Sequence, residues 1–245
     1  MDGGPPVIEH AVSDGIAVIT IANPGRFNAL TIRMWIELER IVTELSTDPR
    51  VLVLVIRGAG DDFSSGFDIH DLPDTDPDRF HPVHLAAEQA IATCPKPVLA
   101  AIRGTCVGGG CEIAVAADLR YADPGARFGV TPSRLGIVYP SQPTRRLVEL
   151  IGVGEARRLL FLGELMDAAW ALRVGLVSEV VAEGEDVIDR TMAVARLLTT
   201  RSQISIAAAK HYTAGGAERS WPATDYAEGV RAFRERRSPG FPSAR

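Results

Sequence analysis

The chain has 245 residues, of which 46% are hydrophobic and 23% charged, proportions that are ordinary for a globular protein with a sizeable core. A net charge of −5 gives no basic surface for nucleic acid. No apolar run reaches the roughly 20 residues needed to span a bilayer, and "MDGGPPVIEH" lacks the basic and apolar regions of a signal peptide. We therefore expect a cytoplasmic protein that does not enter the membrane.

Short apolar runs, alternating or continuous, predict six strands. They span residues 7–12, 16–22, 51–58, 98–102, 119–122 and 176–181. Helical periodicity predicts helices at residues 31–46, 82–93, 111–117, 144–151, 155–161, 168–174, 187–200, 204–213 and 222–237. Thr31 is a candidate N-cap, and residues 23–25 and 72–78 read as turns or loops. Strands and helices interleave up to about residue 181 and only helices follow, which predicts an α/β core with a helical C-terminal portion.

Three consecutive glycines, Gly108, Gly109 and Gly110, lie between a buried-type strand and a helix of small residues. Glycine lets another group approach the backbone closely, and the N–H groups of a helix's first turn attract negative charge. A phosphate loop would need a Lys-Ser/Thr ending or a GxGxxG pattern, and neither is present. The alternatives are a tight packing turn and an oxyanion hole, and three glycines in this setting favour the oxyanion hole.

A second glycine segment, "DDFSSGFDIHDL", follows the strand at residues 51–58. The amide directly after Gly66 could supply a second donor to the same oxyanion. Glu112, in the first turn of the helix after the three glycines, is a candidate acid or base. The competing explanation for Glu112 is the helix dipole, which favours a carboxylate there by roughly 0.3–1 kcal/mol. Its apolar surroundings and the ligand-type turn favour the catalytic interpretation.

The segments "FSSGFDIHDL" and "KPVLAAIRGTCVGGGCEIAVAADLRYADPGARFG" together resemble the crotonase (enoyl-CoA hydratase/isomerase) family. "NPGRFNALT", "LGELMDAAWALRVGLVSEVV" and "YAEGVRAFRERRSPGF" extend the resemblance over nearly the whole chain, in order. It implies an α/β fold made of a crotonase-like spiral of ββα units, and acyl-CoA thioesters as substrates. It also implies self-association as a trimer or dimer of trimers. The implied domains are a core with the acyl-CoA site at residues 1–185 and a helical oligomerisation region at residues 186–245.

By this resemblance, the amides of Phe67 and Gly109 hold the thioester oxygen, and Glu112 transfers protons. The resemblance implies no cofactor and no metal, because coenzyme A is part of the substrate. The remaining substrate-binding residues that it implies are Arg26, Ser65, Gly66, Asp68, Ile69, Gly108, Gly110, Pro132 and Phe233. For Asp68 a local turn bond is the competing explanation, for Arg26 an ordinary surface position, and for Phe233 a charged terminal helix.

One position departs from the pattern of the family's hydratases. These usually carry a second glutamate where this chain has Pro132, in "FGVTPSRLGIVYP", and proline cannot transfer a proton. "TPSRLGIVY" and "FDIHDLP" are similar to the methylmalonyl-CoA decarboxylase branch, which has a tyrosine at the position of Tyr139. Tyr139 either contacts the substrate or packs at the pocket edge. The most general activity, enoyl-CoA hydration or isomerisation, therefore has two alternatives: decarboxylation, and binding of a CoA ester without turnover.

The remaining cysteines and histidines predict little chemistry. Cys94, Cys106 and Cys111 have no metal-ligand spacing and are expected to be buried reduced thiols. His70 either reaches the site from its loop or is solvated. His81 and His84 are expected on a surface helix, exposed to solvent.

Overall fold

The computed structural model describes residues 4–71 and 81–244, so the loop predicted at residues 72–78 lies outside the described part. All six predicted strands form one sheet, in the order β1-β2-β3-β4-β6-β9. Their bounds are β1 Val7–Ser13, β2 Ile16–Ala22, β3 Val53–Gly58, β4 Val98–Ile102, β6 Leu119–Ala122 and β9 Glu179–Val180. β1 pairs antiparallel with β2, and every later pair is parallel. The predicted α/β class is confirmed.

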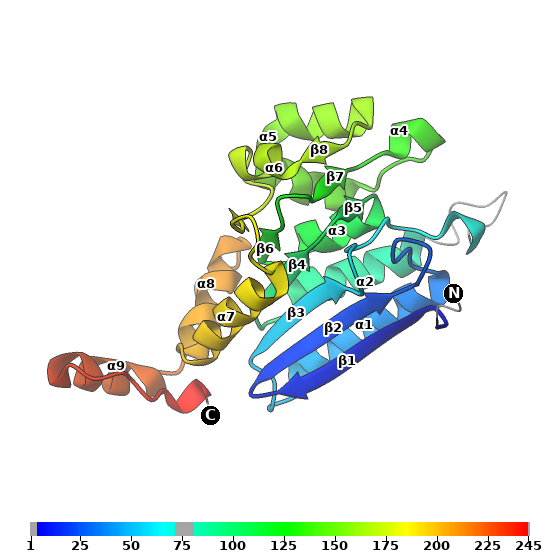
Figure 1. The fold of residues 1–245 in the computed structure, drawn as a ribbon. Coiled ribbons are helices and arrows are strands. Elements are labelled where there is room, and N and C mark those ends of the chain that lie inside the picture. Colours follow the sequence, from blue (N-terminus) through cyan, green and yellow to red (C-terminus); the bar gives the residue numbers. More distant parts are fainter. Residues whose placement is uncertain (1–3, 72–80, 245) are drawn as a thin grey trace.

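Helices cover both faces of this sheet, which explains the continuous apolar runs of its central strands. On β3, Leu54 and Ile56 belong to the core shared with α1 (Ile32–Thr47) and α2 (His81–Thr93). The alternate residues, Val53 and Val55, belong to a second core under α7 (Val187–Thr199). Figure 1 shows α1 and α2 on one side of the sheet and α7 on the other. Thr31 caps α1 as predicted, its hydroxyl oxygen accepting a bond from Met34 N at 3.2 Å.

A second, three-stranded sheet was not predicted from the sequence. It joins β5 (Thr105–Val107), β7 (Arg127–Gly129) and β8 (Met166–Asp167). Strands of two or three residues are too short for an alternating pattern to show in the sequence. This small sheet lies beside α3 (Gly109–Ala116), because Gly108 N donates a 2.8 Å bond to Gly129 O.

Helices dominate the C-terminal half, as predicted for the part after residue 181, with two refinements. The expected helices at residues 144–151 and 155–161 are the two halves of α5 (Ser141–Leu162), which is interrupted at Gly152. A further short helix, α4 (Pro132–Leu135), precedes it. The remaining elements are α6 (Ala168–Arg173), α8 (Gln203–Thr213), α9 (Thr224–Glu235) and short 3₁₀ turns at Ile69–Asp71 and Pro242–Ala244. α9 extends away from the body of the protein (Figure 1).

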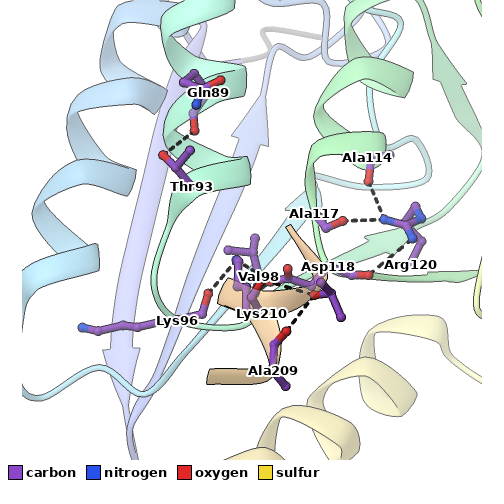
Figure 2. Close-up of polar contacts among 11 residues, drawn as sticks. Gln89, Thr93, Lys96, Val98, Ala114, Ala117, Asp118, Arg120, Ala209 and Lys210 are labelled. Carbon is purple, nitrogen blue, oxygen red and sulfur yellow. Dashed lines mark hydrogen bonds and ion pairs between the residues drawn. The ribbon is translucent and has the colours of Figure 1, made fainter. Parts of the chain in front are cut away.

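A buried arginine fixes the C-terminal end of α3. The guanidinium of Arg120 donates to the carbonyls of Ala114, Ala117 and Asp118, as Figure 2 shows, and also to Leu176 O at 2.7 Å. Burial lowers the pKa of Arg120 to about 10, and a cation at this end also suits the helix dipole. Next to it, the Asp118 carboxylate accepts 2.7 Å bonds from Val98 N and from Lys210 of α8. These bonds hold the C-terminal end of α3, the helix that begins within the three glycines.

The three cysteines are buried free thiols, as predicted. Within residues 4–71 and 81–244, no helix combines the length and the apolar character needed to cross a membrane.

Candidate active site

Two loops meet at the N-terminal end of α3. Ser64 in the first loop forms a parallel bridge with Cys106 of β5, and Val107 N donates to Ser64 O at 2.9 Å. Gly66 then passes so close to α3 that a Cβ atom on it would lie 2.5 Å from Gly109 N. The two glycine segments found in the sequence are therefore direct neighbours in space.

A left-handed backbone angle at Gly108 and close packing at Gly109 and Gly110 account for the three consecutive glycines. Gly108 is the N-cap of α3 and has a φ of 55°, in the left-handed region that side chains disfavour. A Cβ atom on Gly109 would lie 2.8 Å from Cζ2 of Trp35, and one on Gly110 would lie 2.2 Å from Ser64 O. Any larger residue at Gly110 would force the two loops apart.

The first loop is held by an asparagine of the "NPGRFNALT" segment. The Asn28 side chain donates to Ala59 O at 2.9 Å and to Asp62 O at 2.7 Å, and Asn28 O accepts a 2.8 Å bond from the Ser64 hydroxyl. On the far side of Gly66, Leu30 N donates to Gly66 O at 2.7 Å and Asp68 N donates to Leu30 O at 2.9 Å. These bonds on both sides of Gly66 and Phe67 set the direction of the loop backbone.

A cavity of about 170 Å³ opens where the loops meet. Eight of the predicted site residues line it: Ser65, Phe67, Ile69, Gly108, Gly109, Glu112, Pro132 and Tyr139. Six further residues that the sequence did not indicate complete the described lining: His84, Val130, Thr131, Leu135, Ile137 and Pro140. Apolar side chains dominate this wall, with Glu112 as the single carboxylate among the described lining residues.

Glu112 is buried in the first turn of α3, facing the cavity. Its Oε1 atom has no hydrogen-bond partner among the described residues. Burial raises the pKa of the Glu112 carboxyl well above its ordinary value, the negative charge of Glu88 raises it further, and Arg146 acts against both. A carboxyl in this environment favours its neutral, proton-carrying form.

His84 contradicts the prediction of an exposed surface histidine. It is only 2% exposed, lines the cavity, and places Nε2 at 3.5 Å from Glu112 Oε1. Its ring stands edge-on to Phe67, with centroids 5.1 Å apart, while Phe67 stacks on Trp35 at 5.0 Å. The surface assignment was wrong because α2 packs against α1 and α3 and presents this face inward. The side chain of His81 lies outside the described part.

A buried ion pair flanks this arrangement. Glu88, one turn after His84 on α2, contacts Arg146 of α5, and Arg146 also donates to Gln89 Oε1 at 2.9 Å. Burial raises the pKa of Glu88, and the positive charge of Arg146 opposes that rise. The spacing of His84 and Glu88, four residues apart, places them on one helix face. That spacing alone does not show whether the shared face is buried or exposed.

Another part of the cavity wall contains the two residues that depart from the hydratase pattern. Pro132 begins the four-residue helix α4 and is buried, and Tyr139 lies partly buried just before α5. Desolvation raises the pKa of Tyr139 well above its ordinary value, and the negative charge of Glu112 adds to this. Leu135 and Val138 in the same stretch are 56% and 79% exposed, so this wall borders solvent.

Five predicted substrate-binding residues are not part of the described cavity lining: Arg26, Gly66, Asp68, Gly110 and Phe233. Gly66 and Gly110 instead allow the close packing beside it. Asp68 accepts a 3.1 Å bond from His70 N, which is the local turn bond considered as its alternative role, and lies 3.8 Å from the Arg26 guanidinium. His70 is exposed. Phe233 is 86% exposed on α9.

The described residues contain no group of three or more His, Cys, Asp or Glu side chains arranged to hold a metal ion.

The family model for enoyl-CoA hydratase/isomerase matches residues 11–228 of the chain. The chain belongs to this family. A probable enoyl-CoA hydratase of Mycobacterium bovis is 33% identical, over 92% of this chain and 94% of that protein. A crotonyl-CoA hydratase of Syntrophomonas wolfei is 31% identical over the same shares. A solved enoyl-CoA hydratase/carnithine racemase structure from Magnetospirillum magneticum has a TM-score of 0.89 and 29% identity, and the match covers 98% and 97% of the two chains.

Membership in the enoyl-CoA hydratase/isomerase family confirms the resemblance seen in the sequence and the crotonase-like fold. The protein is an enzyme of this family and acts on acyl-CoA.

Proposed function

We propose that this enzyme adds water to the double bond of a short 2-enoyl-CoA thioester. The observation that carries the proposal is the position of the Glu112 carboxyl. It is buried at the cavity, one turn into α3 from Gly109, and its Oε1 lacks a hydrogen-bond partner among the described residues. A buried carboxyl that faces a cavity with its proton available is suited to proton transfer at a bound substrate.

The charge that forms during this reaction needs a separate site. In the proposed mechanism the N–H groups of Phe67 and Gly109 bind the thioester oxygen, which becomes negative as the enolate forms. The close approach of Gly66 to Gly109 N supports this role, and so does the position of Gly109 at the positive end of α3. The chemistry needs no cofactor beyond the coenzyme A of the substrate.

Glu112 serves in this proposal as the acid that protonates the α-carbon. The carboxyl gives its proton to the enolate carbon, and the thioester carbonyl reforms as the oxyanion loses its charge. The raised pKa of Glu112 supports this direction, because the carboxyl then keeps its proton to a higher pH than an ordinary glutamate does. In the reverse reaction, the dehydration, the same carboxylate removes the α-proton.

The acyl group is proposed to lie against the apolar wall. Ile69, Val130, Leu135 and Ile137 supply apolar surface to the cavity lining, which suits an acyl chain. One relative is named crotonyl-CoA hydratase, and crotonyl is a four-carbon enoyl group. We therefore propose crotonyl-CoA as the first substrate to test.

The test measures crotonyl-CoA hydration by the wild-type protein and by Glu112→Gln. We expect turnover by the wild type and a loss of about 100-fold or more in kcat for the variant, the usual size of a general acid–base contribution. Conversion of 3-enoyl-CoA to 2-enoyl-CoA is measured with the same proteins, because isomerisation uses the same α-proton transfer. Hydration at the wild-type rate by Glu112→Gln would remove Glu112 from the mechanism.

Decarboxylation is the second candidate, favoured by Pro132 and Tyr139 in the cavity lining. Loss of CO2 from a methylmalonyl-type thioester would need the oxyanion hole and a proton donor, but no base to remove a carbon-bound proton. CO2 release from methylmalonyl-CoA without crotonyl-CoA hydration would favour this reaction. Binding of both thioesters without turnover of either would favour a CoA-ester-binding role.

We also propose that the protein assembles as a trimer or a dimer of trimers, through the helical region at residues 186–245. α9 supports this, because its aromatic residues Tyr226 and Phe233 are 75% and 86% exposed on a helix that extends from the body (Figure 1). Phe233 and Arg26 then remain candidates for contacts with coenzyme A outside the described cavity. A cytoplasmic location stays part of this proposal, and fractionation of the source cells tests it.

A further inference from the structure

The hydration proposed above needs two proton transfers, and the described cavity lining contains only one carboxylate. Water must lose a proton as its oxygen bonds to the β-carbon, and the α-carbon must gain one. Pro132 occupies the position where a second glutamate was expected, and Thr131 and Pro140 beside it carry no proton-accepting group that titrates near neutral pH. The remaining titratable side chains in the described lining are Tyr139 and His84.

We propose that His84 is the second proton-transfer residue of this site, taking a proton from the attacking water while Glu112 protonates the α-carbon. This inference rests on the proposed hydration. Three observations support it: His84 lines the same cavity as Glu112, its Nε2 lies 3.5 Å from Glu112 Oε1, and it comes from a different helix, so the two groups approach the substrate from two directions.

The ring of His84 is held in a defined orientation by aromatic neighbours. Its centroid lies 5.1 Å from that of Phe67 at an interplanar angle of 88°, and 6.0 Å from that of Trp35 at 64°. Both contacts are edge-type arrangements that aromatic pairs favour. Phe67 also supplies a proposed oxyanion amide, so the imidazole contacts a residue that binds the thioester in the proposed mechanism.

Titratable and charged groups from α2, α3 and α5 and from the segment before α5 lie beside the pair. Glu88 on α2 and Arg146 on α5 form an ion pair beside it, so their charges largely offset one another. Cys111 on α3 and Tyr139 face the same carboxyl, and burial raises the pKa of Tyr139, which keeps it neutral. Glu112 is favoured in its neutral form, and the unprotonated ring nitrogen of a neutral imidazole accepts a proton. The proposed resting pair is a carboxylic acid next to a neutral imidazole.

The atoms and electrons balance over one cycle. The water oxygen bonds to the β-carbon as Nε2 of His84 takes one of its protons. The π electrons of the double bond move onto the thioester oxygen, and the enolate then takes the Glu112 proton at its α-carbon. This leaves an imidazolium and a carboxylate in contact. Transfer of the proton from Nε2 to Oε1 restores the resting pair, with one water added overall.

The experiment compares two reactions in wild type, His84→Gln and Glu112→Gln. The first is hydration of crotonyl-CoA. The second is exchange of the α-hydrogens of butyryl-CoA with D2O, in which the ionised form of Glu112 removes the α-proton and no water attacks the substrate. His70→Gln is the matched control, because His70 is exposed and is not among the described lining residues. His84→Asn serves as a second variant. For every variant, thermal unfolding shows whether the protein is folded, and butyryl-CoA binding shows whether the pocket is intact.

We expect His84→Gln to lose about 100-fold or more in hydration kcat while its α-exchange stays within about fivefold of wild type. Glu112→Gln should lose both reactions, and His70→Gln neither. The inference is overturned if His84→Gln and His84→Asn keep the hydration rate, or if they lose hydration and exchange equally, as a purely structural role requires. Absence of hydration in the wild type would instead refute the proposed function, and that result is visible before any variant is made.

Discussion

Adding one methyl group at Gly66 should separate the two loops of the proposed oxyanion hole. Gly66 has a φ of 95°, and a Cβ there would lie 2.5 Å from Gly109 N and 2.8 Å from Val107 O. Both neighbours are backbone atoms, so the contact cannot be relieved by a side-chain rotation. Since carbon atoms in proteins approach such atoms to about 3.5 Å, Gly66→Ala requires a displacement of about 1 Å at the amide.

Two free-energy terms follow from this displacement. The left-handed φ costs about 1–2 kcal/mol of folding stability for a residue with a side chain. The shift at the amide weakens one donor to the oxyanion, and removal of such a donor typically raises the barrier by about 2.7–4 kcal/mol, or 10²–10³ in kcat. We therefore expect a moderate loss of stability and a much larger loss of activity.

The assay measures crotonyl-CoA hydration and the thermal midpoint for Gly66→Ala and for Gly184→Ala. Gly184 is the matched control because its φ is 89° and a Cβ atom there would meet nothing within 4 Å. The control should lose comparable stability and keep its activity. If Gly66→Ala turns over crotonyl-CoA at the wild-type rate, the two loops do not form the oxyanion site.

Three further predictions test separate parts of the molecule. Gly109→Pro removes the backbone N–H and should abolish turnover, while Gly109→Ala keeps the N–H but meets Trp35 at 2.8 Å; equal activity of the two variants would argue against a role for the amide. Glu112→Gln should be more stable than wild type above pH 5, by a margin that grows with pH. Burial raises the folded-state pKa of Glu112 above its ordinary 4.5, so the stability from its protonated form is lost as pH rises through the folded-state pKa. Thermal unfolding of both proteins from pH 5 to 8.5 measures this stability difference. The neighbouring titratable residues are the same in both proteins: His84, Glu88, Arg146, Tyr139 and Cys111. A difference that stays constant with pH would contradict the prediction. Replacing Tyr226 and Phe233 together with serine should lower the mass measured by light scattering, and an unchanged assembly would exclude α9 from the contact.

The sequence predicted the main sheet and most helices, because buried parallel strands and amphipathic helices leave regular patterns. It could not predict the second sheet, whose strands are two or three residues long. In the site, the glycine segments were recognisable because a close approach between backbones requires glycine. Glu112 was recognisable because it is a carboxylate in the first turn of a helix, shortly after the three glycines. The inward position of His84 was missed, since it depends on how α2 packs between α1 and α3 rather than on the residues next to it.

Two parts of the cavity lining differ in how many hydrogen bonds hold them to the rest of the protein. Glu112 and Gly109 lie on α3, which Arg120 holds from its far end, and Ser64 is fixed by Asn28. Another part of the wall comes from the four-residue helix α4, whose last residue, Leu135, is exposed, as is Val138 after it.

The residues proposed for the reaction therefore lie on the α3 side of the cavity, and residues 132–139 are placed to set substrate selectivity. Residue changes along 132–139 could reshape the space for the acyl tail and leave the proton-transfer geometry in place. The same scaffold could therefore accept longer or branched tails by altering a stretch of eight residues. Redesign of this enzyme toward new thioesters should begin there.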